Sequence, residues 1–261
     1  MSKREIQGSR AIVTGASSGI GREIALELAR QRAELVVVAR REERLRELAD
    51  EIHAGGGRVE VVAGDVTDPA TRQRAVDAAQ ASFGGLDILV NNAGIGAVGL
   101  LEHADAKRVR QVMEVNFFAL VEMTRLALPL LKLGTNPIVV NIGSVLGHRG
   151  VPFRSEYCAS KFAVHGFSEA IRAEFSAHNI DVLLVSPGAT DTEFSQSVVE
   201  HTGEPSWIEP RPVPAAKVAR KAVRAIRRGR HEIIPYGWGR LLYWLNRLSP
   251  RLIDHFMARY M

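Results

Sequence analysis

Short apolar runs alternate with longer amphipathic segments along most of the chain. The segment 11–15, "AIVTG", is apolar, β-branched and ended by glycine, which predicts a strand. The segment 20–33 places Ile20, Ile24 and Leu28 on one face of a helix. By the same criteria, further strands are predicted at 34–40, 58–65, 86–94, 137–144, 181–188 and 231–235. Further helices are predicted at 41–57, 68–85, 105–115, 117–133, 155–178 and 215–228, and Asp68 is the expected N-cap of the second of these, with Pro69 at its first position.

This alternation of strand and helix indicates parallel strands that are buried on both faces. Because crossovers between parallel strands are right-handed, the helices should lie on both sides of the sheet. We therefore predict the α/β class, with a single-domain, Rossmann-type, doubly wound parallel sheet and helices on both faces. The domain takes in residues 1–261, with a core at about 8–235 and a C-terminal helical extension at 236–261 that Pro250 divides into two short helices. The Pro-rich segment 203–214 is expected to be a loop or lid.

The composition is that of a folded protein with a basic surface. Hydrophobic residues make up 46% of the chain and charged residues 24%, so wholesale disorder is not expected. There are 34 Lys and Arg against 29 Asp and Glu, a net charge of +5, which could suit phosphates, nucleic acid or anionic lipid. The chain carries no recognised nucleic-acid-binding module and no Cys/His zinc spacing, so neither a nucleic-acid partner nor a metal site is expected.

Two features bear on the compartment. A single cysteine cannot form an internal disulfide, which fits a reducing environment. The first residues, "MSKREIQGSRAIVTGASSGIG", contain no long apolar run, so neither a signal peptide nor a membrane span is expected. The expected location is the cytoplasm.

The segment "TGASSGIG", 14–21, lies between the first predicted strand and the first predicted helix. Its glycines allow the backbone to approach a pyrophosphate, and the start of the helix offers free N–H groups and partial positive charge. A tight turn alone would also favour glycine, but the position in the first strand–helix unit favours a dinucleotide site. The cofactor-binding residues expected here are Gly15, Ser17, Ser18, Gly19, Ile20 and Gly21.

The end of the second strand distinguishes the two nicotinamide dinucleotides. An acidic residue there would bind the ribose 2′-OH of NAD(H) and repel a 2′-phosphate. This chain has Arg40 and Arg41 instead, which can pair with a 2′-phosphate, and Ser17 could add a hydroxyl. The alternative is a basic helix start at the surface, although cations there oppose the helix dipole. NADP(H) is therefore favoured over NAD(H).

Other residues at the carboxyl ends of the strands should line the same site. Asp65 is placed to accept a hydrogen bond from the adenine amine, and Val66 follows it. The "NNAG" segment, 91–94, ends the fourth strand, and its cofactor-binding residues are expected to be Asn92, Ala93 and Gly94. These asparagines could instead only hold the backbone turn, or they could do both.

A serine, a tyrosine and a lysine follow further along the chain. Ser144 closes the fifth predicted strand, and Tyr157 and Lys161 lie one turn apart in the next helix. With the upstream "TGASSGIG" and "NNAG", these residues are specific in combination. The sequence resembles the short-chain dehydrogenase/reductase family, in its shorter single-domain branch, from about residue 8 to 235.

The resemblance implies catalytic roles. Tyr157 would be the general acid in reduction and the general base in oxidation, and a nearby ammonium and a positive nicotinamide should lower its pKa. Lys161 would supply that ammonium and bind the nicotinamide ribose, and Ser144 would position the substrate oxygen. Asn116, in "EVNFFAL", would hold a water that links Lys161 to solvent. The family usually has glycine three residues later, where this chain has Ala119.

The resemblance also implies a contact of "SPGATDTEF", 186–194, with the nicotinamide. Pro187 and Gly188 would shape the turn beside the ring, the backbone of Thr190 would meet the carboxamide, and Thr192 would bind the carboxamide or a phosphate. The alternative is a plain loop with a helix cap.

The substrate pocket should be walled by the loop after Ser144, by residues after Gly94, and by residues 191–214. The apolar side chains in these segments favour a lipophilic carbonyl or alcohol over a polyol; they are Val145, Leu146, Val151, Phe153, Phe194 and Trp207. His148 is expected at the rim of the pocket. Cys158 is expected to be a packing residue, since it points away from Tyr157 on the helix.

The tail at 236–261 mixes apolar side chains with arginines. It could cover the substrate site, pack against a second subunit, or lie on a membrane surface. Packing on the site or on a subunit is favoured over the membrane. The resemblance implies a homodimer or homotetramer that associates through the long helices near Phe117 and Ser155.

These features predict an NADP(H)-dependent oxidoreductase that interconverts a carbonyl and an alcohol in a small molecule. The rival is a catalytically silent Rossmann protein that binds NADP(H) and regulates a partner, although such relatives usually lose the Tyr or the Lys. An isomerase or dehydratase of nucleotide sugars would need a longer chain with a substrate domain.

Overall fold

The computed structural model describes residues 3–202 and 211–258. Its centre is a seven-stranded sheet in which every neighbouring pair of strands is parallel. In spatial order the strands are β11 (Glu232–Ile233), β7 (Asp181–Val185), β6 (Ile138–Ile142), β4 (Ile88–Asn91), β1 (Arg10–Thr14), β2 (Glu34–Ala39) and β3 (Arg58–Ala63). The central strands are buried and rich in Val and Ile, as expected of a parallel sheet that is covered on both faces.

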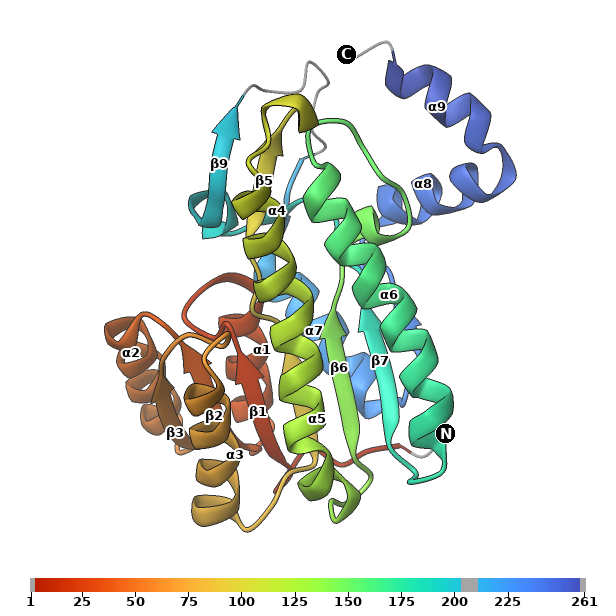
Figure 1. Ribbon diagram of the computed structural model, residues 1–261. Coiled ribbons are helices and arrows are strands. Elements are labelled where there is room, and N and C mark those ends of the chain that lie inside the picture. Colours follow the sequence, from red (N-terminus) through yellow and green to blue (C-terminus); the bar gives the residue numbers. More distant parts are fainter. Residues whose placement is uncertain (1–2, 203–210, 259–261) are drawn as a thin grey trace.

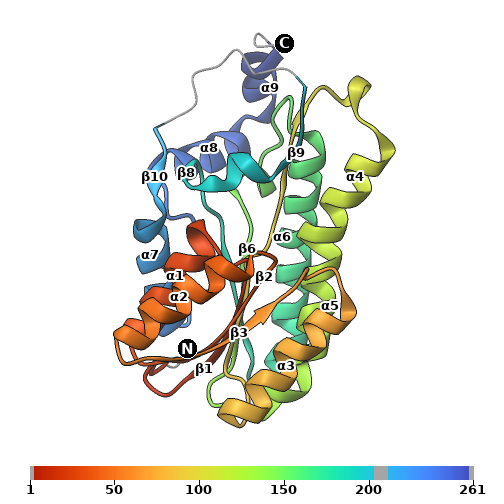
Figure 2. The same ribbon diagram turned by 90° about the vertical axis from the view of Figure 1, so that its left-hand side faces the viewer.

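Three helices cover each face of this sheet (Figures 1 and 2). On one face lie α1 (Gly19–Arg30), α2 (Glu42–Ala54) and α7 (Ala215–Arg227), and on the other α3 (Pro69–Phe83), α5 (Ala119–Lys132) and α6 (Ser155–Ser176). Each face has its own apolar core, for example Ile24 and Leu45 on the first and Met123 and Phe175 on the second. The predicted doubly wound α/β fold is confirmed.

The strand order reverses beside β1, since β2 and β3 lie to one side of it and β4, β6 and β7 to the other. Connections that leave β1 and β4 therefore cross to opposite faces, and a crevice forms outside the carboxyl ends of these strands. Ligands of such sheets bind at this reversal. The residues predicted to bind a dinucleotide follow β1, β2, β3 and β4, so they meet at this edge.

The start of α3 shows how local chemistry sets an element boundary. The carboxylate of Asp68 accepts hydrogen bonds from the backbone N–H groups of Ala70, at 3.0 Å, and Thr71, at 3.3 Å. Pro69 occupies the first helical position, and the helix ends at Gly84 in the left-handed region, at φ 75°. The predicted N-cap is confirmed.

The two helices predicted at 105–115 and 117–133 are present, but the sequence did not show that they are joined. The helical path is continuous: α4 (Ala106–Met113) runs through a π-helical turn at Glu114–Phe118 into α5. A π-turn inserts one extra residue without ending a helix, so it disturbs the apolar period in the sequence and imitates a break. Asn116 lies in this turn.

Two small parallel sheets lie above the carboxyl edge, and the sequence did not predict them. One pairs β5 (Gly96–Gly99) with β9 (Val198–Thr202), and the other pairs β8 (Thr190–Asp191) with β10 (Val213–Pro214). Their strands are short and contain glycine, proline and polar residues, so they carry little periodic signal. The short 3₁₀ segments η1 (Leu101–His103), η3 (Val145–Gly147) and η4 (Glu193–Ser197) complete this upper region.

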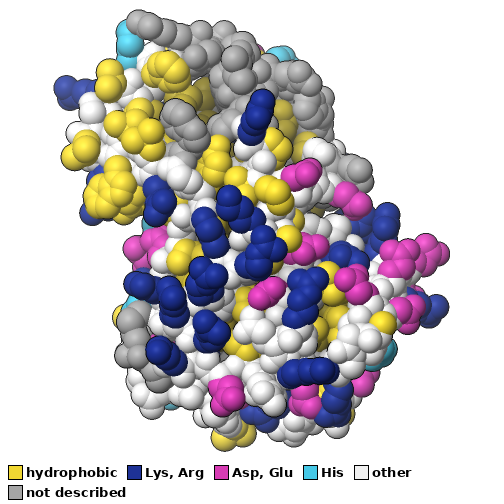
Figure 3. Space-filling view, turned by 180° about the vertical axis from the view of Figure 1, so that it is seen from behind, with side chains coloured by type: hydrophobic (Ala, Val, Ile, Leu, Met, Phe, Trp, Pro, Cys, Tyr) yellow, Lys and Arg dark blue, Asp and Glu magenta, His cyan; other side chains and the backbone are white. Residues whose placement is uncertain are grey.

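The tail forms the two predicted helices, α8 (Gly237–Leu248) and α9 (Pro250–Ala258). Arg149, in the loop after η3, donates hydrogen bonds to Asn246 at 3.1 Å and to Asp254 at 2.6 Å, so the tail is held against the loop that follows Ser144. The outer face of the tail is apolar and exposed, as Figure 3 shows at its upper left. No helix within the described residues is both long and apolar enough to cross a membrane.

Candidate active site

The loop between β1 and α1 is packed closely against the end of β4. Gly15 has a φ of +66°, and a Cβ on it would lie 2.8 Å from the Cα of Ala93. A Cβ on Gly21 would lie 2.4 Å from the Gly15 carbonyl oxygen, so a side chain fits at neither position. This close packing brings the N-terminus of α1, with Gly19 and Ile20 in its first turn, to the reversal point of the sheet.

The N-terminus of α1 is available to an anion. Ser18 is at the N-cap position, but its hydroxyl accepts a hydrogen bond from Arg41 at 2.7 Å and does not cap the helix. Arg41 also donates to the hydroxyl of Ser17, at 3.2 and 3.3 Å. Helix N–H groups, two hydroxyls and a guanidinium thus gather at one point, as the chemistry of phosphate binding requires.

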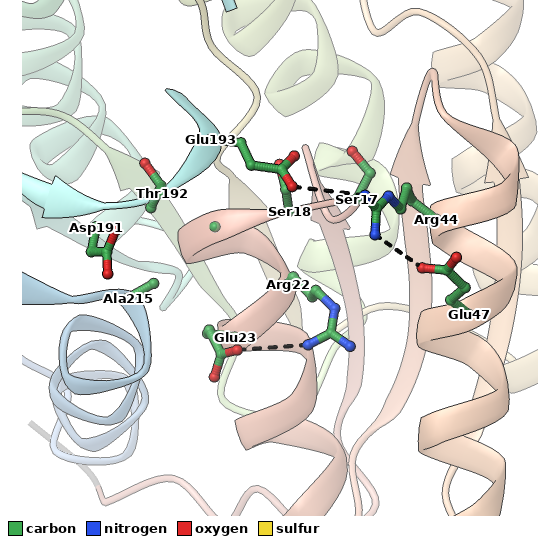
Figure 4. A pocket seen from close by; sticks show the side chains of 11 residues that line it. Ser17, Ser18, Arg22, Glu23, Arg44, Glu47, Asp191, Thr192, Glu193 and Ala215 are labelled. Carbon is green, nitrogen blue, oxygen red and sulfur yellow. Dashed lines mark hydrogen bonds and ion pairs between the residues drawn. The ribbon is translucent and has the colours of Figure 1, made fainter. Parts of the chain in front are cut away.

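A cavity of about 310 Å³ opens beside this point, between the glycine loop, α1, α2 and the segment after β8 (Figure 4). Glu193 reaches into it and pairs with Arg41 at 2.7 Å and with Arg44 at 3.9 Å. These ion pairs hold the pKa of the Glu193 carboxyl below its ordinary value. Sequence reasoning missed both Glu193 and Arg44, because their meeting depends on the fold of the segment after β7.

The carboxyl ends of β2 and β3 carry the next expected residues. Arg40 is exposed and lies 4.0 Å from the carboxylate of Asp65. The other carboxylate oxygen of Asp65 accepts from the backbone N–H and the hydroxyl of Thr67, both at 2.9 Å. The carbonyl of Val66 accepts from Arg72 at 2.7 Å, so this corner is fixed by its own hydrogen bonds.

Asn92, directly after β4, holds the backbone turn, which both sequence interpretations allow, and its contact with a cofactor stays a prediction. The amide of Asn92 donates to the carbonyls of Thr14 at 2.9 Å and Gly15 at 3.1 Å, which ties the glycine loop to β4. Ala93 N–H donates to the Thr14 hydroxyl at 3.1 Å. Asn91 points into the core and donates to Asn141 at 3.0 Å.

The structure brings Ser144, Tyr157 and Lys161 together at the carboxyl end of β6. Ser144 caps η3, where its hydroxyl accepts from Leu146 N–H at 3.1 Å, and its interaction with Tyr157 lowers the pKa of the tyrosine. The ammonium of Lys161 donates to the Ile142 carbonyl at 2.9 Å and lies 5.7 Å from the centroid of the Tyr157 ring. The serine, the tyrosine and the lysine thus form one cluster.

The direction of the Tyr157 pKa shift differs from the sequence-based expectation. Burial raises the pKa of Tyr157 to about 12, against a smaller lowering by the Ser144 hydrogen bond. Burial also lowers the pKa of Lys161 to about 8. In the protein alone, desolvation dominates the pKa shifts of both groups, so Tyr157 keeps its proton at neutral pH. The further effect of a positive nicotinamide stays a prediction.

Asn116 is buried at the π-turn and fixes the neighbouring backbone. Its amide oxygen accepts from Ile95 N–H at 2.8 Å, and its amide nitrogen donates to the Ile95 carbonyl and the Ser160 hydroxyl, both at 3.0 Å. A Cβ on Gly94 would lie 3.2 Å from the Asn116 oxygen and 3.8 Å from the Lys161 nitrogen. Asn116 therefore lies close to Lys161, and its role with a water stays a prediction.

The loop after β7 contacts both the segment that follows Ser144 and the glycine loop. The Pro187 carbonyl accepts from Val145 N–H at 2.9 Å, and the Gly188 carbonyl accepts from the Thr190 hydroxyl at 2.9 Å. A Cβ on Gly19 would lie 3.0 Å from the methyl carbon of Thr192. Thr192 also caps η4, as the alternative interpretation expected, and its contact with a cofactor stays a prediction.

Apolar side chains lie on the substrate side of the cluster. The Phe194 ring meets the Tyr157 ring edge-on, with centroids 5.8 Å apart. Val145, Leu146, Val151 and Phe153 are half-buried along the loop after Ser144. Trp207, expected to join them, lies outside the described residues.

Separate predictions were made for Cys158 and His148, two side chains near the cluster. Cys158 is buried, and burial raises the pKa of its thiol, which confirms a packing residue. His148 was expected at the rim, but its side chain is only 4% exposed and hydrogen-bonds Glu232 and Ser186. Sequence reasoning also missed the buried ion pair of Arg108 with Glu156, directly before Tyr157.

Comparison with known proteins agrees with this geometry. Residues 9–203 match the family model described as short chain dehydrogenase. The chain is 36% identical to the 11-beta-hydroxysteroid dehydrogenase A of Sesamum indicum, over 96% of this chain and 74% of that protein.

Two solved structures are similar in fold. A short chain dehydrogenase/reductase from Burkholderia phymatum, in complex with NAD, superposes with a TM-score of 0.87 at 26% identity, covering 95% of this chain and 96% of that one. A short chain dehydrogenase from Burkholderia cenocepacia, in complex with NADP, superposes with a TM-score of 0.78 at 30% identity, covering 88% of this chain and 97% of that one.

Proposed function

The chain belongs to the short-chain dehydrogenase/reductase family, and on that basis we propose that it interconverts a carbonyl and an alcohol of a lipophilic substrate with NADP(H). Membership makes it an oxidoreductase that uses a nicotinamide cofactor and acts on a small molecule. The observation that carries the reaction type is the cluster of Ser144, Tyr157 and Lys161 beside the loop that follows β7.

The residues of the cluster have distinct tasks in carbonyl reduction. When bound, the nicotinamide supplies the hydride that goes to the carbonyl carbon. Tyr157, with a pKa near 12, holds the proton that the developing alkoxide takes up, and in alcohol oxidation the same oxygen accepts it back. The Ser144 hydroxyl orients the substrate oxygen toward Tyr157, and Lys161 stabilises the phenolate that remains.

The preference for NADP(H) is supported by two arginines beside the glycine loop, Arg41 and Arg44. Arg41 lies within hydrogen-bonding distance of Ser17 and Ser18, and Arg44 lines the cavity beside that loop. A 2′-phosphate would take the place of the Glu193 carboxylate, which already bridges Arg41 and Arg44 there. Similar structures hold either NAD or NADP, so the preference depends on these side chains.

The lipophilic substrate class is supported by Phe194 against Tyr157 and by the half-buried apolar loop after Ser144. The name of the relative from Sesamum indicum indicates a hydroxysteroid, a substrate of the same polarity. A ring system of that kind would bury apolar area against these side chains, which favours it over a polyol.

A screen of ketones, aldehydes and secondary alcohols, followed by NADPH absorbance, tests the reaction type. We expect turnover of apolar cyclic ketones or alcohols and little of polyols. The rival function, a silent NADP(H)-binding regulator, would give cofactor binding by fluorescence without turnover of any compound in the screen.

Replacing Arg40 by Asp together with Arg41 by Ala should shift the enzyme toward NAD(H). The double variant loses charge-assisted hydrogen bonds to a 2′-phosphate and gains a carboxylate for a ribose hydroxyl. We therefore expect the ratio of kcat/KM for NADPH to that for NADH to fall by about 10²-fold. An unchanged ratio would refute the proposed specificity.

Two further variants sharpen that experiment. Arg46→Ala removes an exposed α2 guanidinium that pairs with Glu42, away from the glycine loop, and should leave the ratio unchanged. Glu193→Gln removes the carboxylate that competes for Arg41, so it should tighten NADPH binding about 2- to 10-fold and affect NADH little. Equal effects on both cofactors would place Glu193 outside the phosphate site.

We also propose a homodimer or homotetramer. Phe118 and Phe162 leave 49% and 46% of their surfaces exposed on the two long helical segments through which family members associate. Phe118→Glu with Phe162→Glu should yield monomers by light scattering coupled to size exclusion. Leu133→Glu, a substitution at the exposed end of α5, is the control that should leave the oligomer intact. A wild-type monomer contradicts the proposal.

The cytoplasm remains the proposed compartment. One cysteine that is buried and unpaired fits a reducing environment. Fractionation of cells that produce the protein would test this, and recovery from the secreted fraction would contradict it.

A further inference from the structure

Three metal-ligating side chains from distant parts of the chain meet behind the active site. His148 follows η3, His165 lies on α6 one turn beyond Lys161, and Glu232 is in the edge strand β11. One ligand atom of each lies within 4.8 Å of those of the other two. We propose that these three residues form a binding site for a divalent transition-metal ion, of the class of Zn²⁺, which joins the loop, the helix and the strand.

The ligand set and its spacing suit this class of ion. Two imidazoles and one carboxylate form one of the sets that hold zinc, while Mg²⁺ and Ca²⁺ prefer oxygen ligands alone. Ligands at about 2.0–2.2 Å from a tetrahedral ion lie about 3.3–3.6 Å from one another. The His148 Nε2 and Glu232 Oε1 atoms are 2.9 Å apart, and the two imidazole rings have centroids 4.4 Å apart. Rotations of these side chains can therefore bring the three atoms to metal-binding distances.

The hydrogen-bond partners of His165 also suit a metal. The two nitrogens of His165 each have an oxygen partner: Nδ1 lies 3.3 Å from the Gly147 carbonyl and Nε2 lies 3.4 Å from Glu169. Whichever nitrogen binds the ion, the other has a partner that orients the ring and sets its tautomer.

The cluster has a candidate for a fourth ligand and a path to solvent. The Ser186 hydroxyl lies 3.1 Å from His148 Nε2 and 3.5 Å from Glu232 Oε1, so it or a water can complete four ligands. Glu232 also lines a pocket of about 210 Å³ with Tyr243 and Trp244, which gives the site access to solvent.

Two cations face the site and must be weighed against the proposal. Arg172 acts on Glu232, but its guanidinium donates to the carbonyls of Val182 and His231, at 3.3 and 3.2 Å. Arg240 lines the same pocket as Glu232 and is exposed. The carboxylates of Glu232 and Glu169 offset them. The competing interpretation is a plain hydrogen-bonded pair of His148 and Glu232, which the experiment distinguishes.

The test measures metal binding directly and does not depend on activity. The untagged full chain is stripped with EDTA and titrated with Zn²⁺ by calorimetry and with Co²⁺ by visible absorption. We expect one ion per chain, a tetrahedral Co²⁺ spectrum, and a Tm that rises by about 5–10 °C at 100-fold excess of Zn²⁺ over Kd. Failure of the wild-type chain to bind one ion would overturn the proposal.

Variants assign the binding to these residues. His165→Asn and Glu232→Gln each remove one ligand and should weaken Zn²⁺ binding at least about 10-fold, in line with the loss of a metal-site residue. His178→Asn, at an exposed position just past the C-terminal end of α6, is the matched control and should bind as wild type. Unchanged binding in His165→Asn would refute the site.

One more substitution distinguishes metal binding by the His165 side chain from a purely structural role. His165→Cys keeps a ligand and should retain Co²⁺ binding with a new thiolate-to-metal absorption. Circular dichroism establishes that each variant is folded. If Glu232→Gln does not fold, the comparison of Asn and Cys at position 165 decides, because Asn must lose the ion and Cys must keep it.

Discussion

Tyr157→Phe is expected to lower kcat by about 10³-fold and to leave NADP(H) affinity nearly unchanged. The substitution removes one oxygen from a side chain that lies between Ser144 and Lys161, and it keeps the ring that packs against Phe194. In this variant, water must donate the proton to the substrate oxygen in place of the tyrosine. Single-turnover reduction, followed by NADPH absorbance, measures the chemical step, and fluorescence titration measures cofactor binding.

The matched control is Tyr243→Phe, which removes the same atom from a tyrosine on α8 whose hydroxyl accepts from Arg247 at 3.4 Å. That variant should reduce substrate at the wild-type rate. Because the pKa of Tyr157 is raised to about 12, wild-type reduction should not be limited by its deprotonation near neutral pH, whereas oxidation should accelerate as pH rises. Full activity in Tyr157→Phe would exclude it as the acid and base.

Arg108→Ala is expected to lower the free energy of unfolding by about 3–5 kcal/mol, which is a large part of the stability of one domain. Arg108 and Glu156 are each only 2% exposed, and the Arg108 Nε donates to Glu156 Oε1 at 2.8 Å. Removal of the guanidinium leaves a buried carboxylate without its cation. Urea unfolding at neutral pH measures the difference.

The exposed pair of Arg125 and Glu122, with side chains 73% and 41% exposed, provides the control. Arg125→Ala should change the unfolding free energy far less than Arg108→Ala does, because water already solvates both charges. Equal losses in the two variants would contradict the argument from burial. Arg108→Met combined with Glu156→Leu should recover much of the loss, since no charge then remains buried.

The contribution of this pair depends on pH in a defined direction. Burial raises the pKa of Glu156, but hydrogen bonds from its own backbone, Arg108 and Ser155 lower it. The net result is a pKa below the ordinary 4.5. A carboxyl group whose pKa is lower in the folded chain stabilises the fold at pH values above its pKa in the unfolded chain. That stabilisation is lost as the pH falls through the pKa of the folded chain. The difference between wild type and Arg108→Ala should therefore be constant at neutral pH and shrink below about pH 4.5.

The same ion pair bears on the active site. Glu156 directly precedes Tyr157 at the start of α6, and Arg108 belongs to α4, so their contact fixes the end of one helix against the other. Sequence reasoning could not find it, because both residues are ordinary members of amphipathic helices. Only the packing of α4 on α6 buries them together.

The cofactor-binding end of the site, in contrast to this ion pair, could be predicted from the sequence. The glycine loop, Arg41 and Asn92 were predicted from residues next to strand ends, and the parallel sheet gathers such residues at one edge whatever the details of packing. The contact of Glu193 with Arg41 was not predicted, because it depends on the fold of β8 and η4. These elements are too short and irregular to show a hydrophobic period in the sequence.

The sequence by itself determined the fold class, the strand ends that line the binding edge and the family to which the chain belongs. These follow from local information: hydrophobic period, glycine spacing and the short distances in sequence between Ser144, Tyr157 and Lys161. Tertiary structure alone decided the direction of the Tyr157 pKa, the π-turn at Asn116, the burial of His148 and its meeting with His165 and Glu232. Desolvation and contacts between distant segments leave no local pattern in the sequence. They can therefore be recognised only in the folded chain.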